Sequence, residues 1–383
     1  MHNNTPSPDL NSFQADCTAD KRPLAFRAQC VRVEQKETKG GKPFFTCEFA
    51  DATGTMKLKA WSDNPSAEWC RIAHGNMGHV NPPGCAPVNW CVEVSGTFSK
   101  GEYGVESNDW TVRPLTGEER AAFFLGSAEL RAKQQRDYDD IVVFIQGMKD
   151  CHFQTLCVRF LDERGMEFRR AAAARSNHHA RPGGLVEHVA GMMRAASALA
   201  EAYNVTLADE APALGVPTVN RDLLLTGVLF HDCGKLNENQ YRPDSFEMPF
   251  TPIAELLGHI PIGTLFVDKL WFACEERDLK LKLCHGPNAD AWPADKLLHL
   301  LHLIVSHHGT KEWGSPTEPK TYEAILLHYV DNTDAKMEML RAGFAVVPRV
   351  APGITGRVYP FGHGLVETPA WMNNEAQQPS CAN

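Results

Sequence analysis

The hydrophobic pattern of the chain changes its period near residue 115. Before that point, short segments alternate apolar and polar residues with the two-residue period of a β-strand. After it, apolar residues recur at the three- and four-residue spacing of an amphipathic helix. The pattern therefore predicts a multidomain α and β protein, with a β domain followed by an all-α domain.

The first part reads as a small barrel. Alternation is clearest at residues 45–49 and 56–61, and further strands are predicted at 24–33, 90–98 and 103–112. Gly-containing turns at 39–42 and 51–54 separate the early strands, and 62–89 is expected to be a long irregular insertion. Five short strands of this kind favour a Greek-key barrel, with the OB-fold as the leading candidate.

The alternation also predicts which side chains of the barrel face solvent. Met56, Leu58 and Ala60 are expected to point inward. The side chains expected to point outward are basic or aromatic: Phe44, Lys57, Lys59 and Trp61. Proteins that bind single-stranded nucleic acid combine cations for the phosphates with aromatic rings for the bases. The alternative is that the two aromatic rings pack against the helical domain.

The second part is predicted to be helical throughout. Residues 118–136 are expected to form a connecting helix, and further helices are expected at 185–203, 221–230, 262–276, 294–306 and 321–337. The resulting domains are a disordered arm at 1–19, an OB-like nucleic-acid-binding domain at 20–115, a helical linker at 116–140, a helical domain at 141–345 and an extension with a frayed tail at 346–383.

Composition narrows the class of protein. The chain is 43% hydrophobic and 22% charged, and it contains no apolar run long enough to span a membrane and no secretory signal. Its twelve cysteines form no Cys-x-x-Cys pair, which favours reduced thiols in a cytoplasmic protein. A net charge of −9 argues against a protein that coats nucleic acid, although residues 21–113 carry a small basic excess.

Histidines and aspartates supply the candidate chemistry. His231 and Asp232 close an apolar predicted helix, and similar groups lie among Leu, Ile and Val elsewhere: His188, His259, His307 and Asp331. A single histidine of this kind is usually a core or capping residue. Several buried imidazoles and carboxylates must instead be paired or ligated, which indicates convergence on a shared centre. Mixed ligands without thiolate suit Mn, Fe, Co, Ni or Zn, often as two ions.

The order of these residues resembles the HD superfamily of metal-dependent phosphohydrolases. The local strings are similar to those of the YhaM-type 3′→5′ exoribonucleases, a family that carries an OB-fold before its HD domain. The resemblance covers residues 20–345. It includes the strings at 177–188, 231–235 and 258–260, and it is most specific at 306–316, followed by 319–324 and 327–335.

The resemblance implies roles for individual residues. It implies metal ligands at His188, His231, Asp232 and Asp331, and His259 and His307 for a second ion bridged by Asp232. His308 can replace His307. Asp232 and Lys235 are implied to be catalytic, with Lys235 in contact with substrate phosphate. The alternative for Lys235 is an ammonium group that reaches solvent at a helix end. Manganese is the leading metal, with Fe, Co, Ni, Zn or Mg as alternatives.

The leading function is therefore a 3′→5′ exonuclease on single-stranded RNA, or on DNA. The alternatives are a small-nucleotide or cyclic-nucleotide phosphohydrolase and a non-catalytic single-strand-binding protein. Gly314-Ser315-Pro316 differs from the Gly-Tyr-Pro of cyclic-di-GMP phosphodiesterases, which disfavours that activity. Arg175 is a candidate phosphate contact or an ordinary exposed arginine, and His299, His302 and His328 are expected to be structural. The sequence leaves a homo-oligomer open.

Overall fold

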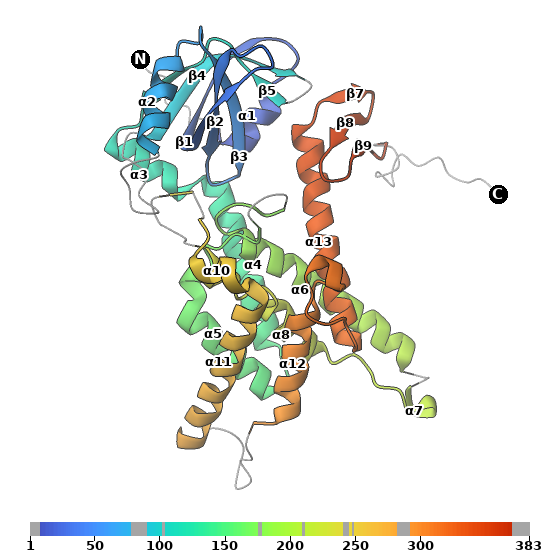
Figure 1. Ribbon diagram of the computed structural model, residues 1–383. Coiled ribbons are helices and arrows are strands. Elements are labelled where there is room, and N and C mark those ends of the chain that lie inside the picture. Colours follow the sequence, from blue (N-terminus) through green and yellow to red (C-terminus); the bar gives the residue numbers. More distant parts are fainter. Residues whose placement is uncertain are drawn as a thin grey trace, which may run out of the picture. The chain divides into compact units, whose positions relative to one another are not determined.

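A computed structural model describes residues 8–77, 90–101, 104–174, 178–208, 211–239, 245–246, 249–281 and 292–369. The chain divides into two compact units. We call Met1–Leu125 with Met337–Asn383 the sheet unit, and Gly126–Lys336 the helical unit (Figure 1).

The sheet unit contains one curled antiparallel sheet. Its strands are β1 (Arg22–Glu37), β2 (Pro43–Ala50), β3 (Thr55–Trp61), β4 (Cys91–Gly101), β5 (Gly104–Glu106) and β6 (Thr111–Pro114). The order is β3-β2-β1-β4-β5, and β6 also pairs with β4. The first half of β1 pairs with β4 and the second half with β2, with a register shift between Cys30 and Arg32. Such a bulge bends a strand, and the end strands β3 and β5 approach each other.

The predicted alternation of β3 is confirmed. Met56, Leu58 and Ala60 are buried, whereas Lys57 and Lys59 are exposed. Two predictions about the surrounding chain are wrong. The segment 62–89 is not wholly irregular, because α2 (Ala67–Met77) lies in it, and the strand predicted at 103–112 is interrupted and gives β5 and β6. Residues 78–89 lie outside the described part.

The predicted disordered arm is wrong for residues 10–16, which form α1 (Leu10–Asp16). The Asp9 carboxylate caps this helix by accepting a hydrogen bond from the Ser12 amide. Leu10 and Phe13 are fully buried, and the Phe13 ring lies 4.5 Å from that of Phe26. The short helix therefore closes one end of the sheet's core, which no local pattern of the arm indicated.

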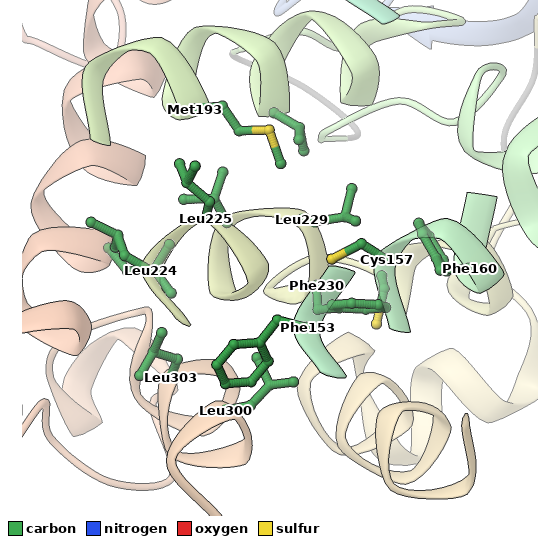
Figure 2. Packing of buried hydrophobic residues seen from close by; sticks show 14 of the residues in the cluster. Phe153, Cys157, Phe160, Met193, Leu224, Leu225, Leu229, Phe230, Leu300 and Leu303 are labelled. Atoms are coloured by element: carbon green, nitrogen blue, oxygen red, sulfur yellow. The ribbon is translucent and has the colours of Figure 1, made fainter. Parts of the chain in front are cut away.

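The helical unit consists mainly of helices, as predicted, and the structure shows that it is built around one buried helix, α8. The elements are α4 (Ala128–Gln146), α5 (Cys151–Phe168), α6 (Gly184–Leu207), α7 (Ala211–Leu214), α8 (Arg221–Phe230), α9 (Lys235–Glu238), α10 (Pro252–Leu257), α11 (His259–Leu281), α12 (Ala294–Ser306), the 3-10 helix η3 (Lys311–Trp313) and the first part of α13 (Tyr322–Val346). Figure 2 shows α8 at the centre of the core, where Leu224, Leu225 and Phe230 pack among side chains of α5, α6 and α12.

The connection between the units differs from the single helix predicted at 118–136. It consists of α3 (Gly117–Leu125) and α4, which are separated at Gly126, where φ is +72°. Ser127 then caps α4 by accepting a hydrogen bond from the Leu130 amide. After α13, a small sheet of β7 (Arg349–Ala351), β8 (Ile354–Val358) and β9 (His363–Val366) completes the sheet unit. Among the described residues, no helix is long and apolar enough to cross a membrane.

Candidate metal centre

The centre begins where α8 ends. His231 continues the last turn, since its amide donates to the Gly227 carbonyl, and Asp232 follows it before α9. Gly234 is required here, because a Cβ at this position would lie 1.9 Å from the carbonyl oxygen of His259. Only glycine allows the start of α11 to approach the His231–Asp232 pair this closely.

Six predicted residues converge at this point. We call them the histidine–aspartate cluster: His188, His231, Asp232, His259, His307 and Asp331. Asp232 lies at the centre, with the Nε2 atoms of His231, His259 and His307 at 3.3, 3.4 and 3.8 Å from its carboxylate oxygens. The Nε2 atom of His188 lies 3.3 Å from Oδ1 of Asp331. The predicted meeting of residues from five separate helices is thus present in the structure.

The facing atoms of the cluster are the donor set of a cation. The Nε2 atoms of His188, His231, His259 and His307 are buried and make no hydrogen bond within the described residues, and the same holds for Oδ1 of Asp232. Orphaned polar atoms of this kind are costly in a protein interior. Two ligands about 2.1 Å from one ion lie roughly 3 Å apart, close to the separations observed. The residues therefore fit a divalent metal.

Hydrogen bonds on the opposite side of each ring orient these nitrogens. Nδ1 of His231 lies 2.8 Å from the Val228 carbonyl oxygen, and Nδ1 of His307 lies 2.7 Å from that of Ile304. A carbonyl oxygen only accepts, so each Nδ1 must carry the proton and each Nε2 must present a lone pair. This is the arrangement that metal-ligating histidines use.

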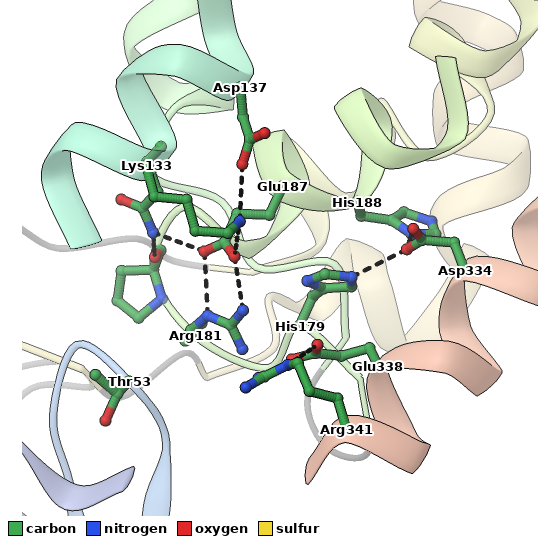
Figure 3. A network of polar contacts seen from close by, with 12 residues as sticks. Thr53, Lys133, Asp137, His179, Arg181, Glu187, His188, Asp334, Glu338 and Arg341 are labelled. Carbon is green, nitrogen blue, oxygen red and sulfur yellow. Dashed lines mark hydrogen bonds and ion pairs between the residues drawn. The ribbon is translucent and has the colours of Figure 1, made fainter. Parts of the chain in front are cut away.

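Asp334 performs the same task for His188, and no role was predicted for it. Its Oδ2 lies 2.7 Å from Nδ1 of His188 and 2.9 Å from Nε2 of His179 (Figure 3). Asp331 and Asp334 are three residues apart and therefore share a face of α13. That spacing is the signal that could have identified Asp334 as a positioning residue.

A second buried carboxylate lies next to His188 in the chain. Glu187 accepts two hydrogen bonds from Arg181, one from Lys133 and one from Gln134 (Figure 3). Burial raises the pKa of Glu187, but the hydrogen bonds and charge of Arg181 outweigh it, and the pKa is lowered to about 2. This ion pair fixes the first turn of α6, from which His188 projects.

His307 and His308 differ in their relation to Asp232. His307 is buried and directs Nε2 toward Asp232, whereas Nδ1 of His308 lies 2.8 Å from the Trp313 carbonyl oxygen. The His308 ring remains close, at 5.3 Å from that of His259. Ligand atoms of His259, His307 and His308 lie within 4.8 Å of one another. The geometry places His307 nearer the centre and His308 at its edge.

Lys235 points into the centre. Its Nζ lies 2.6 Å from Oδ2 of Asp232 and also donates to the Ala173 carbonyl. Only 13% of its side chain is exposed, so the alternative of an ammonium group reaching solvent is wrong. Arg175 lies outside the described residues. Nε2 of His302 accepts a hydrogen bond from the Lys320 amide, which suits the structural role expected for it.

Neighbouring groups in the centre oppose the effect of burial on the pKa values of its side chains. Burial raises the pKa of Asp232, but Lys235 and His231 outweigh it and hold the pKa well below its usual range. Burial likewise raises the pKa of Asp331, but the neighbouring imidazoles of His188 and His231 outweigh it and hold the pKa below its usual range. Burial lowers the pKa of His188, but Asp331 and Asp334 reverse this and raise it to about 9. Both carboxylates of the cluster are therefore ionised at neutral pH.

The predicted nucleic-acid-binding residues lie together on the sheet unit. Phe44 pairs with Trp61 across β2 and β3, and their ring centroids are 4.8 Å apart. Lys59 lies opposite Thr46 and Lys57 opposite Glu48, with 65% of the Lys57 side chain exposed. Because these four positions share one side of the pleat, they form a continuous surface, which we call the sheet face.

Comparisons with known proteins agree with this centre. Residues 185–336, which include the whole cluster, match the HD domain family. The chain is 32% identical to the 3′-5′ exoribonuclease YhaM of Bacillus subtilis over 85% of its own length and 89% of that protein. The identity to YhaM of Bacillus velezensis is 31%, and to that of Bacillus licheniformis 30%, with the same coverage. The chain therefore belongs to the YhaM family of HD-domain proteins.

Proposed function

We propose that this protein is a metal-dependent 3′→5′ exonuclease that hydrolyses the phosphodiester bonds of single-stranded RNA, and that it also accepts single-stranded DNA. The observation that carries the proposal is the convergence of orphaned imidazole nitrogens on two carboxylates: the Nε2 atoms of His231, His259 and His307 on Asp232, and that of His188 on Asp331. The relatives, whose alignment covers 85% of this chain, are named 3′-5′ exoribonucleases. This supports RNA as the substrate and hydrolysis from the 3′ end.

The cluster divides naturally into two sets of ligands. His188, His231, Asp232 and Asp331 would hold one ion, and His259 and His307, together with the bridging Asp232, would hold a second. Manganese is our leading choice, since imidazole and carboxylate ligands suit it. Divalent ions bound here supply Lewis acidity toward a phosphoryl oxygen and lower the pKa of a water molecule.

The chain's own residues then prepare the site for a phosphodiester. Asp232 stays ionised despite its burial, because the ammonium group of Lys235 stabilises its charge. Lys235 is the one described side chain that brings an ammonium group to within 2.6 Å of Asp232, and this position suits contact with a substrate phosphate. Asp334 and the carbonyl oxygens of Val228 and Ile304 hold the protons on Nδ1, which keeps the Nε2 lone pairs directed inward.

The sheet unit would hold the strand. The long bulged β1, the strand order and the approach of β3 to β5 support an OB-fold, which binds oligonucleotides across the strands that carry the sheet face here. Phe44 and Trp61 offer two adjacent rings to the bases, and Lys57 and Lys59 offer charge to the phosphates. We place the enzyme in the cytoplasm, since its described cysteines are all free thiols.

A labelled oligonucleotide tests the proposal. Purified protein with Mn²⁺ is incubated with RNA labelled at its 5′ end, and separately with RNA labelled at its 3′ end. We expect the 3′ label to appear at once as a mononucleotide, while the 5′-labelled strand shortens stepwise. Hydrolysis of mono- or dinucleotides alone would favour a small-nucleotide phosphohydrolase. If the metal-loaded protein bound the strand without hydrolysing it, the protein would be a non-catalytic single-strand-binding protein.

A further inference from the structure

Two large aromatic side chains lie exposed beside the histidine–aspartate cluster. Trp313 ends the 3-10 helix η3 and is 60% exposed, and Tyr329 on α13 is 61% exposed. The ring of His328 lies against both, at centroid distances of 6.0 Å from Trp313 and 5.0 Å from Tyr329. We call these three residues the aromatic row.

Hydrogen bonds join two residues of the aromatic row to His307 of the cluster and to its neighbour His308. The carbonyl oxygen of Trp313 accepts from Nδ1 of His308, and Nδ1 of His328 donates to the carbonyl oxygen of His307. The two contacts measure 2.8 and 2.9 Å. Between them lies Gly309, with φ of +83°, where a Cβ would come within 2.3 Å of the His328 ring. Trp313 and His328 are therefore held next to the cluster by the consecutive residues His307 and His308.

The exposure of these rings has no structural explanation within the helical unit. Single exposed aromatic residues are common on protein surfaces. Here, however, two of them flank a third ring, and hydrogen bonds join Trp313 to His308 and His328 to His307. Lys311 and Glu312 precede Trp313 and cancel each other in charge, so the segment is not built to attract phosphate. Flat, neutral, exposed ring faces are suited to stacking with bases.

We propose that Trp313, His328 and Tyr329 form a stacking platform for the bases of the nucleotides next to the scissile phosphodiester. This inference rests on the proposed function, because it takes a single strand as the substrate. Stacking there would hold the terminal nucleotides against the cluster. The platform recognises a base by its aromatic face, so it tolerates any sequence.

Kinetics of single substitutions test the platform. Trp313→Ala and Tyr329→Ala are each expected to raise the KM for a single-stranded oligonucleotide about ten-fold, with a smaller change in kcat, as expected when one base loses its stacking partner. Trp313→Phe keeps a ring and should recover most of the loss. Tyr203→Ala on α6 and Phe272→Ala on α11 serve as matched controls, because both residues are exposed aromatics more than two helical turns from any cluster residue.

Substrates without bases separate stacking from a structural effect. On a strand of abasic nucleotides, the ratio of KM between Trp313→Ala and wild type should fall toward one. An equal loss on abasic and ordinary strands would overturn the platform, and so would unchanged kinetics of both alanine variants on ordinary strands.

A binding measurement keeps this test independent of the proposed function. Anisotropy of a fluorescein-labelled oligonucleotide, recorded without added metal, reports affinity even if wild type cleaves no nucleic acid. Weaker binding by Trp313→Ala than by Phe272→Ala supports the platform in that case. Equal affinities of wild type and Trp313→Ala would overturn it.

Discussion

Charged groups are placed in opposite ways in the two units. In the helical unit the carboxylates of Asp232 and Glu187 are buried, and each is surrounded by cationic or imidazole groups. On the sheet face the charges are exposed, and the one pair that includes Lys57 joins it to Glu48 at 3.6 Å. In the proposed function both arrangements would meet the same polyanionic substrate, but buried and exposed charges interact with it through different physics.

The difference follows from solvation. A buried carboxylate that loses its partner costs several kcal/mol, so each interior group depends strongly on its neighbours. An exposed pair contributes less than about 1 kcal/mol and is screened by salt. Interior charges should therefore control chemistry and stability, whereas those of the sheet face should control only affinity and its dependence on salt. The following predictions test this division.

The largest effect is expected at the centre of the cluster. Asp232→Ala removes the carboxylate shared by both proposed ligand sets, and exonuclease activity should fall about 1000-fold or more. Bound metal, measured by mass spectrometry of the purified protein, should fall with it. The exposed Asp162 on α5 provides the control, and Asp162→Ala should keep full activity and metal content. An Asp232→Ala variant that still held both activity and metal would exclude Asp232 as a bridging ligand.

A smaller effect, on stability, is expected at Glu187. Only 1% of its side chain is exposed, and its pKa is about 2 in the folded protein against 4.5 as the ordinary value. The folded state therefore binds the proton more weakly, and the resulting stability is complete above about pH 4.5. It is lost as pH falls toward 2 and amounts to about 3 kcal/mol.

Chemical denaturation between pH 6 and 3 measures this effect. Glu187→Gln should lower the free energy of unfolding at pH 6 and remove part of its dependence on pH. The exposed ion pair of Glu163 with Arg159 is a matched control, so Glu163→Gln should change little. If both variants behaved alike, burial would not be the reason for the effect at Glu187.

Asp334 should affect metal affinity without abolishing chemistry. Asp334→Asn weakens the hydrogen bond that orients His188, and removing such a partner typically lowers metal affinity roughly 10- to 100-fold. The concentration of Mn²⁺ that gives half-maximal activity should rise, and excess Mn²⁺ should restore most of the rate. Thr333→Ala, an exposed neighbour on α13, should leave that concentration unchanged. A loss that excess metal does not restore would point to a role other than positioning.

The same contrast explains what could be predicted from sequence. The cluster was predictable because a polar group among Leu and Val must be ligated, as at His231 and Asp331. The direction of the β3 side chains followed from alternation, since one face of that strand is buried. Both signals arise from burial, because buried positions recur in the sequence at the period of the helix or strand that carries them.

Features that depend on contacts between distant segments left no such trace. Asp334 orients His188 only because α6 and α13 bring the two residues together. The helix α1 was not predicted, because its Phe13 is buried against Phe26 of β1, a different element. No pattern in the sequence distinguishes Trp313, since its exposure and its neighbours appear only in the fold. The local sequence pattern identifies which residues must be buried, but it does not identify which residues of distant segments will contact them.

The smallest effect is expected on the sheet face. Replacing Lys57 and Lys59 by alanine should weaken binding of single-stranded RNA several-fold at low salt and leave cleavage of a dinucleotide nearly unchanged. The slope of log affinity against log salt should fall by about 0.7 for each lysine that contacts a phosphate. Trp61→Ala should weaken binding with no change in that slope, because stacking involves no counterion release. Anisotropy titrations at several salt concentrations measure both quantities.

Lys21→Ala is the control for this last test, since Lys21 is exposed in the same unit just before β1. Its slope should stay close to that of wild type. If the double lysine variant also kept the wild-type slope, then Lys57 and Lys59 would not contact phosphates, and the sheet face would not bind the strand through its charge. If that variant instead lost dinucleotide cleavage as well, exposed charge would act on the chemistry itself, and the division between interior and surface charges would be wrong.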